Sequence, residues 1–160
     1  MMRVEDDQLD LNEPTGFAAW SQSPNDPRQE ITLHHLMTMT SGLSFTEDYG
    51  PESDVVKMLY GQSDMAHYAM NKPLEHSKAV GQIWHYSSGS VNLVALRLRQ
   101  SFSGDDRAYL EYPHQRLFGP LGMTSAVLEL DASGTFVGSS SMFATARDWL
   151  KVGQLVLDRK

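Results

Sequence analysis

The chain has 160 residues, 41% of them hydrophobic and 21% charged, which is typical of one globular domain with an apolar core. Thirteen basic against twenty acidic residues give a formal charge of −7, without a compact Lys/Arg stripe, so we expect no binding to nucleic acid. The absence of cysteine excludes disulfides, thiolate nucleophiles and Cys-based zinc sites.

The first residues lack the basic start and apolar core of a signal peptide, and no apolar run approaches membrane-spanning length. We therefore expect no transmembrane segment in this chain, and its localisation stays open.

Loop structure is predicted for residues 12–30, which hold three prolines among Asn, Asp and Ser. In the rest of the first half, each helix is predicted from a hydroxyl residue that can cap its start and a Gly or Pro that can end it. These helices are 31–43 with Thr32 as cap, 54–61 with Ser53, and 64–71 with Ser63.

The second half is predicted to alternate between extended and helical segments. Its β-branched and aromatic composition favours an extended conformation for 81–86. A spacing of apolar residues typical of helices, or a cap signal, then predicts three helices with a hairpin before the last. They are 88–101, a helix from Asp105 or Asp106 towards Leu117 that Pro113 kinks or breaks, the hairpin 126–130 with 135–138, and 146–158 capped by Thr145.

Most site motifs are missing from the sequence. His34 and His35 are adjacent and would point in different directions on a helix, and no His-Glu-x-x-His occurs, so we expect no metal site and no cofactor. The Gly-x-Ser-x-Gly elbow and a phosphate-binding Gly-rich loop are also missing. One candidate is left, Tyr86, which precedes a helix start and by itself would more often be an ordinary packed tyrosine.

Four segments together resemble serine hydrolases related to class C β-lactamases and penicillin-binding proteins. "ITLHHLMTMTSGLSF" is similar to the signature helix of that family, and "GQIWHYSSGSVNLVALRL" to its second motif and the helix that follows. "LFGPLGMTSAVLELD" resembles the Pro-Leu-Gly-Met segment, and "FVGSSSMFATARDWLKVGQLVL" the later loop and helix. The four occur in the family's order over most of residues 1–160.

The resemblance implies a fold and a chemistry. The fold expected is mainly α with a few short strands, the helical region of the α/β β-lactamase/transpeptidase-like fold without most of its antiparallel sheet. The resemblance makes Tyr86 the family's proton-transferring tyrosine and places Ser88 at the third position of its Tyr-x-Asn or Tyr-x-Ser element. Ser139, Ser140 and Ser141 are then substrate-binding candidates. The variant Tyr-Ser-Ser looks more like the esterase and 6-aminohexanoate-oligomer hydrolase branch than like a dedicated β-lactamase.

Two family motifs are absent from the sequence. The family's nucleophile lies in Ser-x-x-Lys, and its third motif is Lys-Thr-Gly or a His/Trp-x-Gly relative. No lysine here has a serine three residues before it; the residues at that position are Asp54, Ala69, Glu75, Asp148 and Leu157. In the family these motifs would fall before Met1 and after Lys160, so we expect 1–160 to be a single partial domain, inactive on its own.

Two interpretations of function stay open. In the first, the chain is a fragment of an enzyme that cleaves small amide or ester substrates through an acyl-enzyme. In the second, it is a non-catalytic helical module, derived from the same family, that binds a partner. Either way, the face that the sheet would cover in the family is expected to be exposed and apolar, which favours self-association.

Overall fold

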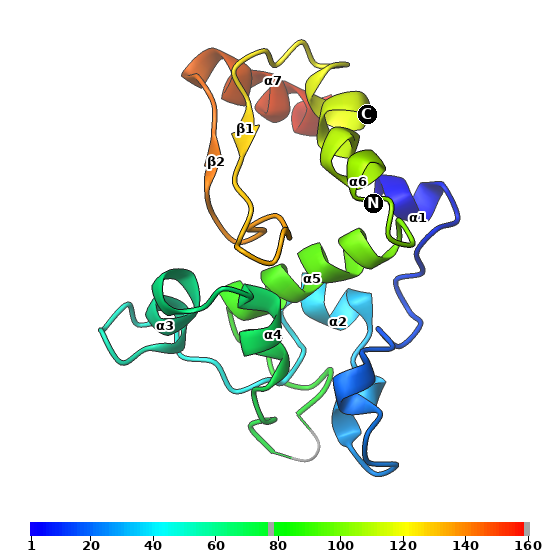
Figure 1. Ribbon diagram of the computed structural model, residues 1–160, viewed down its shortest axis with the longest axis vertical. Helices are drawn as coiled ribbons and strands as arrows, with labels where there is room; N and C mark the ends of the chain where they lie inside the picture. The colour runs from blue at the N-terminus through cyan, green and yellow to red at the C-terminus, as the bar shows by residue number, and fades with distance from the viewer. Residues whose placement is uncertain (77–78, 159–160) are drawn as a thin grey trace.

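The structure is a computed structural model that describes residues 1–76 and 79–158. Figure 1 shows α5 (Ser88–Gln100) in the middle of the molecule, between α2, α3 and α4 on one side and the two strands with α7 on the other. The remaining elements, with η1 and η2 as 3-10 helices and η3 as a π-helical turn, are α1 (Met2–Glu5), η1 (Ala18–Trp20), η2 (Pro27–Glu30), α2 (Leu33–Met37), α3 (Asp54–Gly61), α4 (Met65–Met70), α6 (Asp106–Pro113), η3 (His114–Phe118), β1 (Val127–Leu128), β2 (Met142–Phe143) and α7 (Ala146–Leu157).

The larger hydrophobic cluster is built where α5 packs against α4 and α2. Gly89 allows the close approach, because a Cβ at this position would lie 2.8 Å from the Phe45 ring and 3.1 Å from the Cβ of Ala69. The fully buried members of the cluster include Trp20, Ile31, Leu36, Phe45, Val55, Met58 and Leu93. This cluster fixes the N-terminal half of α5, the part that follows Tyr86.

A smaller cluster lies between η3, the two strands and α7, around Phe118, Met123 and Ala126. β1 pairs with β2 in antiparallel register, Val127 opposite Phe143. The predicted hairpin is therefore only partly right. A tight turn does join its two arms, with a bridge between Leu130 and Phe136, but the partner of β1 is the later strand.

Side-chain caps start α2, α5 and α7, as their sequences predict. The Thr32 hydroxyl accepts from the His35 amide at 3.2 Å, and Thr145 accepts from the amide of Asp148 at 3.4 Å. The predicted cap at Ser53 is wrong, because its hydroxyl donates to the Gly50 carbonyl oxygen at 2.7 Å and makes no capping hydrogen bond to α3. The predicted cap at Ser63 is wrong: α4 begins one residue later, and Asp64 accepts from the His67 amide at 2.8 Å. A carboxylate is also favoured there by the partial positive charge of a helix N-terminus.

Two further predicted elements differ from the structure. The helix predicted over 31–43 ends at Met37, because Met39 takes a left-handed conformation with φ of 60° and breaks the helix. Residues 83–87 are irregular rather than a strand, although their backbone is anchored; the His85 amide, for example, donates to Met39 O at 2.9 Å. Trp84 is 69% exposed, which shows that no neighbouring sheet covers this segment. The composition of the segment favours a strand, but the partner that a strand needs is not there in the described part of the chain.

The fold class is confirmed as mainly α with a few short strands. In the described part of the chain, the strands that pair over more than one residue form a single two-stranded sheet. None of the helices described there is long and apolar enough to cross a bilayer.

The exposed side of α7 carries large apolar side chains. Leu150, Val156 and Leu157 are each more than 70% exposed, and Trp149 is 44% exposed. A helix that forms part of a closed core would bury such a stripe. In the chain as described, α7 therefore presents an apolar face to solvent.

An ion pair between α3 and the end of α4 gives a prediction for pH dependence. Partial burial alone would raise the pKa of the Asp54 carboxyl, but the hydrogen bonds from Lys72, Tyr68 and the Thr46 amide outweigh it and lower the pKa to about 2. Asp54→Asn is expected to lower the free energy of unfolding at pH 7 by about 2 kcal/mol. Urea denaturation measures the difference.

The pH at which this contribution disappears follows from the sign of the shift. The folded pKa is lower than the unfolded value of about 3.9, so the stabilisation is complete above that value and is lost as the pH falls towards 2. The wild type and Asp54→Asn should therefore converge at acidic pH. Glu52→Gln, which breaks a well-exposed ion pair with Lys57, serves as the control and should unfold like the wild type. An Asp54→Asn defect of equal size at pH 2 and pH 7 contradicts the assignment.

Candidate active site around Tyr86

Tyr86 lies at the surface, two residues before α5 begins. Its side chain is 47% exposed, which is unlike the packed tyrosine that its sequence context would otherwise favour. The segment before it is held in place by His85, whose Nε2 lies 2.8 Å from the carbonyl oxygen of Phe45. The phenol is therefore carried on an anchored backbone and is open to a ligand from solvent.

The N-terminus of α5 is closed by two side chains from different parts of the chain. Ser87 is the N-cap, and its hydroxyl accepts from the amide of Ser90 at 3.1 Å. The Ser88 amide donates to a carboxylate oxygen of Glu47 at 3.0 Å, and the Ser88 hydroxyl donates to the other oxygen. The amides of a first helical turn have no partner within the helix, so a carboxylate is a favourable acceptor there.

Ser88 is consequently placed beside Tyr86 in sequence but is itself buried, with 3% of its surface exposed. Its hydroxyl is occupied by Glu47 rather than pointed at solvent. In this arrangement Ser88 connects the tyrosine segment to Glu47. Sequence reasoning missed Glu47, because the two residues are 41 positions apart and no local pattern connects them.

Asn92 joins the Ser139–Ser141 segment to the same helix. Its side-chain amide donates to the Ser139 hydroxyl at 2.9 Å and to the carbonyl oxygen of Ser88 at 3.1 Å, while its oxygen accepts from the Gly138 amide at 3.1 Å. Asn92 is 2% exposed and satisfies all of these groups at once. The structure thus brings the predicted serine segment within one helical turn of Ser88, through a residue that the sequence analysis did not single out.

The three serines line an open groove of about 530 Å³ between α5, the strands and α7. Most of its walls are apolar, and Tyr86 is not among the residues that line it. Within the wall, Ser141 has a left-handed backbone with φ of 62°, and its carbonyl oxygen accepts from the Glu129 amide at 3.1 Å. The groove and the phenol are therefore separate features, both built on α5.

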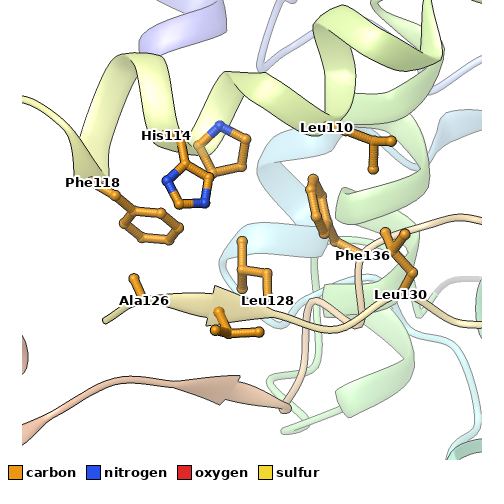
Figure 2. A pocket seen from close by; sticks show the side chains of 9 residues that line it. Leu110, His114, Phe118, Ala126, Leu128, Leu130 and Phe136 are labelled. Carbon is orange, nitrogen blue, oxygen red and sulfur yellow. The ribbon is translucent and has the colours of Figure 1, made fainter. Parts of the chain in front are cut away.

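A second cavity, of about 230 Å³, lies between α6, η3 and β1 (Figure 2). Leu110, Phe118, Leu128, Leu130 and Phe136 line it, and His114 brings the one titratable side chain. A cavity of this composition lacks the several converging polar groups of a catalytic site. We interpret it as a packing gap of the smaller hydrophobic cluster.

The negative charge of Glu47 acts on Tyr49, which lies two residues further along the chain. Desolvation first, and then the negative charge of Glu47, raise the pKa of the Tyr49 hydroxyl above its ordinary value. At neutral pH this second phenol is therefore protonated and can donate a hydrogen bond. Among the residues that the structure describes, no group of three His, Asp or Glu side chains is arranged to hold a metal ion.

A surface tyrosine thus lies in front of a long helix, and a serine-lined groove lies further along that helix. The fold that carries them is that of the helical region of β-lactamase-like proteins. The Beta-lactamase family profile matches residues 1–160, so the chain belongs to the beta-lactamase family. Among curated proteins the sequence has no significant match.

Solved structures share the fold at low sequence identity. D-amino acid amidase from Ochrobactrum anthropi SV3, in complex with L-phenylalanine amide, has a TM-score of 0.64 at 18% identity, and the match covers 98% of this chain and 52% of the amidase. The octameric penicillin-binding protein homologue from Pyrococcus abyssi has a TM-score of 0.66 at 17% identity, covering 100% of this chain and 42% of the homologue. The chain thus spans about half the length of these proteins.

Proposed function

We propose that this chain is the helical part of a serine hydrolase that cleaves small amide or ester substrates through an acyl-enzyme. In this proposal Tyr86 exchanges a proton with the attacking group, Ser88 fixes the segment that carries the tyrosine, and Ser139 to Ser141 line the substrate side. The observation that carries the proposal is the exposure of the Tyr86 phenol on an anchored segment at the start of α5. The family membership supports the reaction class.

The proposed chemistry needs a nucleophilic serine in a Ser-x-x-Lys motif, and residues 1–160 contain no such motif. In the family reaction a serine oxygen attacks the carbonyl carbon, and its proton passes by way of the tyrosine or a lysine to the departing amine or alcohol. Water then attacks the acyl-enzyme, which releases the acid and restores the serine. A neighbouring lysine ammonium would also favour the phenolate form of the tyrosine. Coverage of about half of each similar structure supports a larger protein as the active form.

The coding sequence on either side of these 160 residues tests this proposal. An in-frame Ser-x-x-Lys upstream and a Lys-Thr-Gly-like motif downstream are expected. A stop codon directly upstream of an expressed 160-residue product would favour the non-catalytic binding module instead.

Labelling and kinetics give the matching prediction for Tyr86. The 160-residue chain should not react with a serine-directed fluorophosphonate, and covalent labelling of it would overturn the proposal. In the extended protein, Tyr86→Phe is expected to lower kcat for amide or ester hydrolysis by about 100-fold or more, because it removes the proton-transferring group. Tyr60→Phe, at a side chain 83% exposed on α3, is the control and should leave kcat unchanged.

A further inference from the structure

One short segment of the chain holds the backbone on both sides of Tyr86. The carbonyl oxygen of Phe45 lies 2.8 Å from Nε2 of His85, the residue directly before the tyrosine. The carboxylate of Glu47 accepts from the amide of Ser88 at 3.0 Å and also from the Ser88 hydroxyl, two residues after the tyrosine. Tyr86 therefore lies between two contacts that start only two residues apart in the chain.

This segment, residues 45–47, is itself fixed to two helices. The Phe45 side chain is buried and packs on α5, where Gly89 leaves room for its ring. The Thr46 hydroxyl accepts from the amide of Asp54, the first residue of α3, at 2.8 Å, and the Thr46 amide donates to the Asp54 carboxylate at 2.9 Å. The carboxylate that follows is thus carried by a backbone that is held at both preceding residues.

The position of the Tyr86 phenol depends on the backbone that carries it. Its side chain is half exposed, so packing against neighbours covers only part of the ring. The two hydrogen bonds from Ser88 to one carboxylate fix both the distance and the orientation of the first turn of α5 relative to Glu47, and bonds to a charged acceptor are stronger than those between neutral groups. Since a displacement of about 1 Å can slow a reaction by about 100-fold, such a support can matter for the rate without touching the substrate.

We propose that Glu47 is a positioning residue, which holds the Tyr86 phenol in place for proton transfer by binding Ser88. Both of its oxygens are engaged by Ser88, so its role is to hold the segment rather than to accept the substrate's proton. The effect on the rate rests on the proposed function, because it requires that Tyr86 transfers a proton. The placement of the tyrosine is a property of the 160-residue chain and needs no catalysis.

Backbone NMR relaxation of the 160-residue chain measures this placement. The order parameter of the Tyr86 amide should be about 0.85 in the wild type, as in rigid backbone, and should fall towards about 0.6 in Glu47→Ala. Glu47→Gln keeps an oxygen that can accept from the Ser88 amide and should stay close to the wild type. The matched control is Glu52→Ala, at an exposed acid paired with Lys57, and it should change nothing at Tyr86. An unchanged order parameter in Glu47→Ala would overturn the proposal.

Kinetics of the extended protein separate positioning from a general loss of structure. Glu47→Ala should lower kcat for amide or ester hydrolysis by about tenfold or more and leave KM nearly unchanged, because proton transfer is affected and binding of the ground state is not. Glu47→Gln should restore most of this loss, since the hydrogen bonds matter and the charge does not. A Glu47→Gln variant as slow as Glu47→Ala contradicts the positioning role.

A double variant shows whether Glu47 acts through the tyrosine. In the Tyr86→Phe background, Glu47→Ala should lower kcat no further, because the group that it positions is already gone. An equal loss in both backgrounds would mean that Glu47 supports the fold in general, and the proposal would be wrong.

The positioning role and the proposed function fail separately. If Tyr86→Phe leaves kcat unchanged, the proposed function is wrong, and the order parameter of Tyr86 still decides whether Glu47 holds the segment. If Tyr86→Phe lowers kcat while Glu47→Ala changes neither kcat nor that order parameter, Tyr86 transfers the proton and Glu47 does not position it.

Discussion

Gly42→Ala is expected to lower the free energy of unfolding by about 3 kcal/mol or more. Gly42 has φ of +74°, a left-handed conformation that costs alanine about 1 kcal/mol or more. An added Cβ would also lie 2.7 Å from the backbone carbon of Ala79 and 2.9 Å from its oxygen, and a backbone cannot move aside as a flexible side chain can. Overpacking of this kind typically costs about 1–3 kcal/mol, so the two costs together reach about 3 kcal/mol or more.

The damage should extend to Tyr86, because residues 39–41 hold the segment that carries it. Met39 and Thr40 accept from the amides of His85 and Gly81, and the Ser41 hydroxyl lies 3.1 Å from that of Ser90. Urea denaturation measures the loss. Gly153→Ala is the control, since this α7 glycine has no atom within 4 Å of an added Cβ and alanine should stabilise the helix by up to about 1 kcal/mol. Equal stability of Gly42→Ala and wild type would show that the turn is not constrained as described.

Asn92→Ala is expected to cost about 3 kcal/mol, the second largest effect. The substitution removes three hydrogen bonds at once and leaves the Gly138 amide and the Ser139 hydroxyl without their partner, whereas the carbonyl of Ser88 lies within α5 and can still accept from a backbone amide of that helix. Each buried group that loses its hydrogen bond costs about 1–3 kcal/mol, moderated here because the Gly138 amide is only partly buried. The loop 138–141 should then detach from α5.

Chemical denaturation and amide hydrogen exchange check this expectation separately. The exchange rate of the Gly138 amide should rise before the global stability is lost, because its acceptor is gone. Ser140→Ala is the matched control, since Ser140 is exposed and makes its hydrogen bond through its backbone amide. If Asn92→Ala and Ser140→Ala unfold at the same urea concentration, Asn92 does not connect the two segments.

Local signals were enough to locate most of the helices. α3 and α5 begin at the predicted residues and end within one residue of the prediction, and α7 ends at Leu157, one residue early. The starts of α5 and α7 are encoded within three or four residues by a capping side chain and the apolar spacing behind it, whereas α3 begins at Asp54 without a side-chain cap. The family resemblance could likewise be detected from the sequence, because the family's motifs are short and contiguous.

Contacts distant in sequence account for the rest. Segment 81–86 has the composition of a strand, yet strand formation needs a partner that composition does not reveal. β1 pairs with β2, which follows the second arm of the predicted hairpin. No turn signal in the sequence predicts this pairing. The support given to Ser88 by Glu47 and to Ser139 by Asn92 likewise spans more than forty residues and becomes visible only once the chain is folded.

The apolar face of α7 has a practical consequence for these experiments. The face carries Trp149, Leu150, Val156 and Leu157, and such an exposed apolar surface favours association of two copies as the protein is concentrated. Urea denaturation curves measured at several protein concentrations should therefore have the same midpoint where the unfolding is that of single copies. A midpoint that shifts with dilution would show that association between copies contributes to the measured stability.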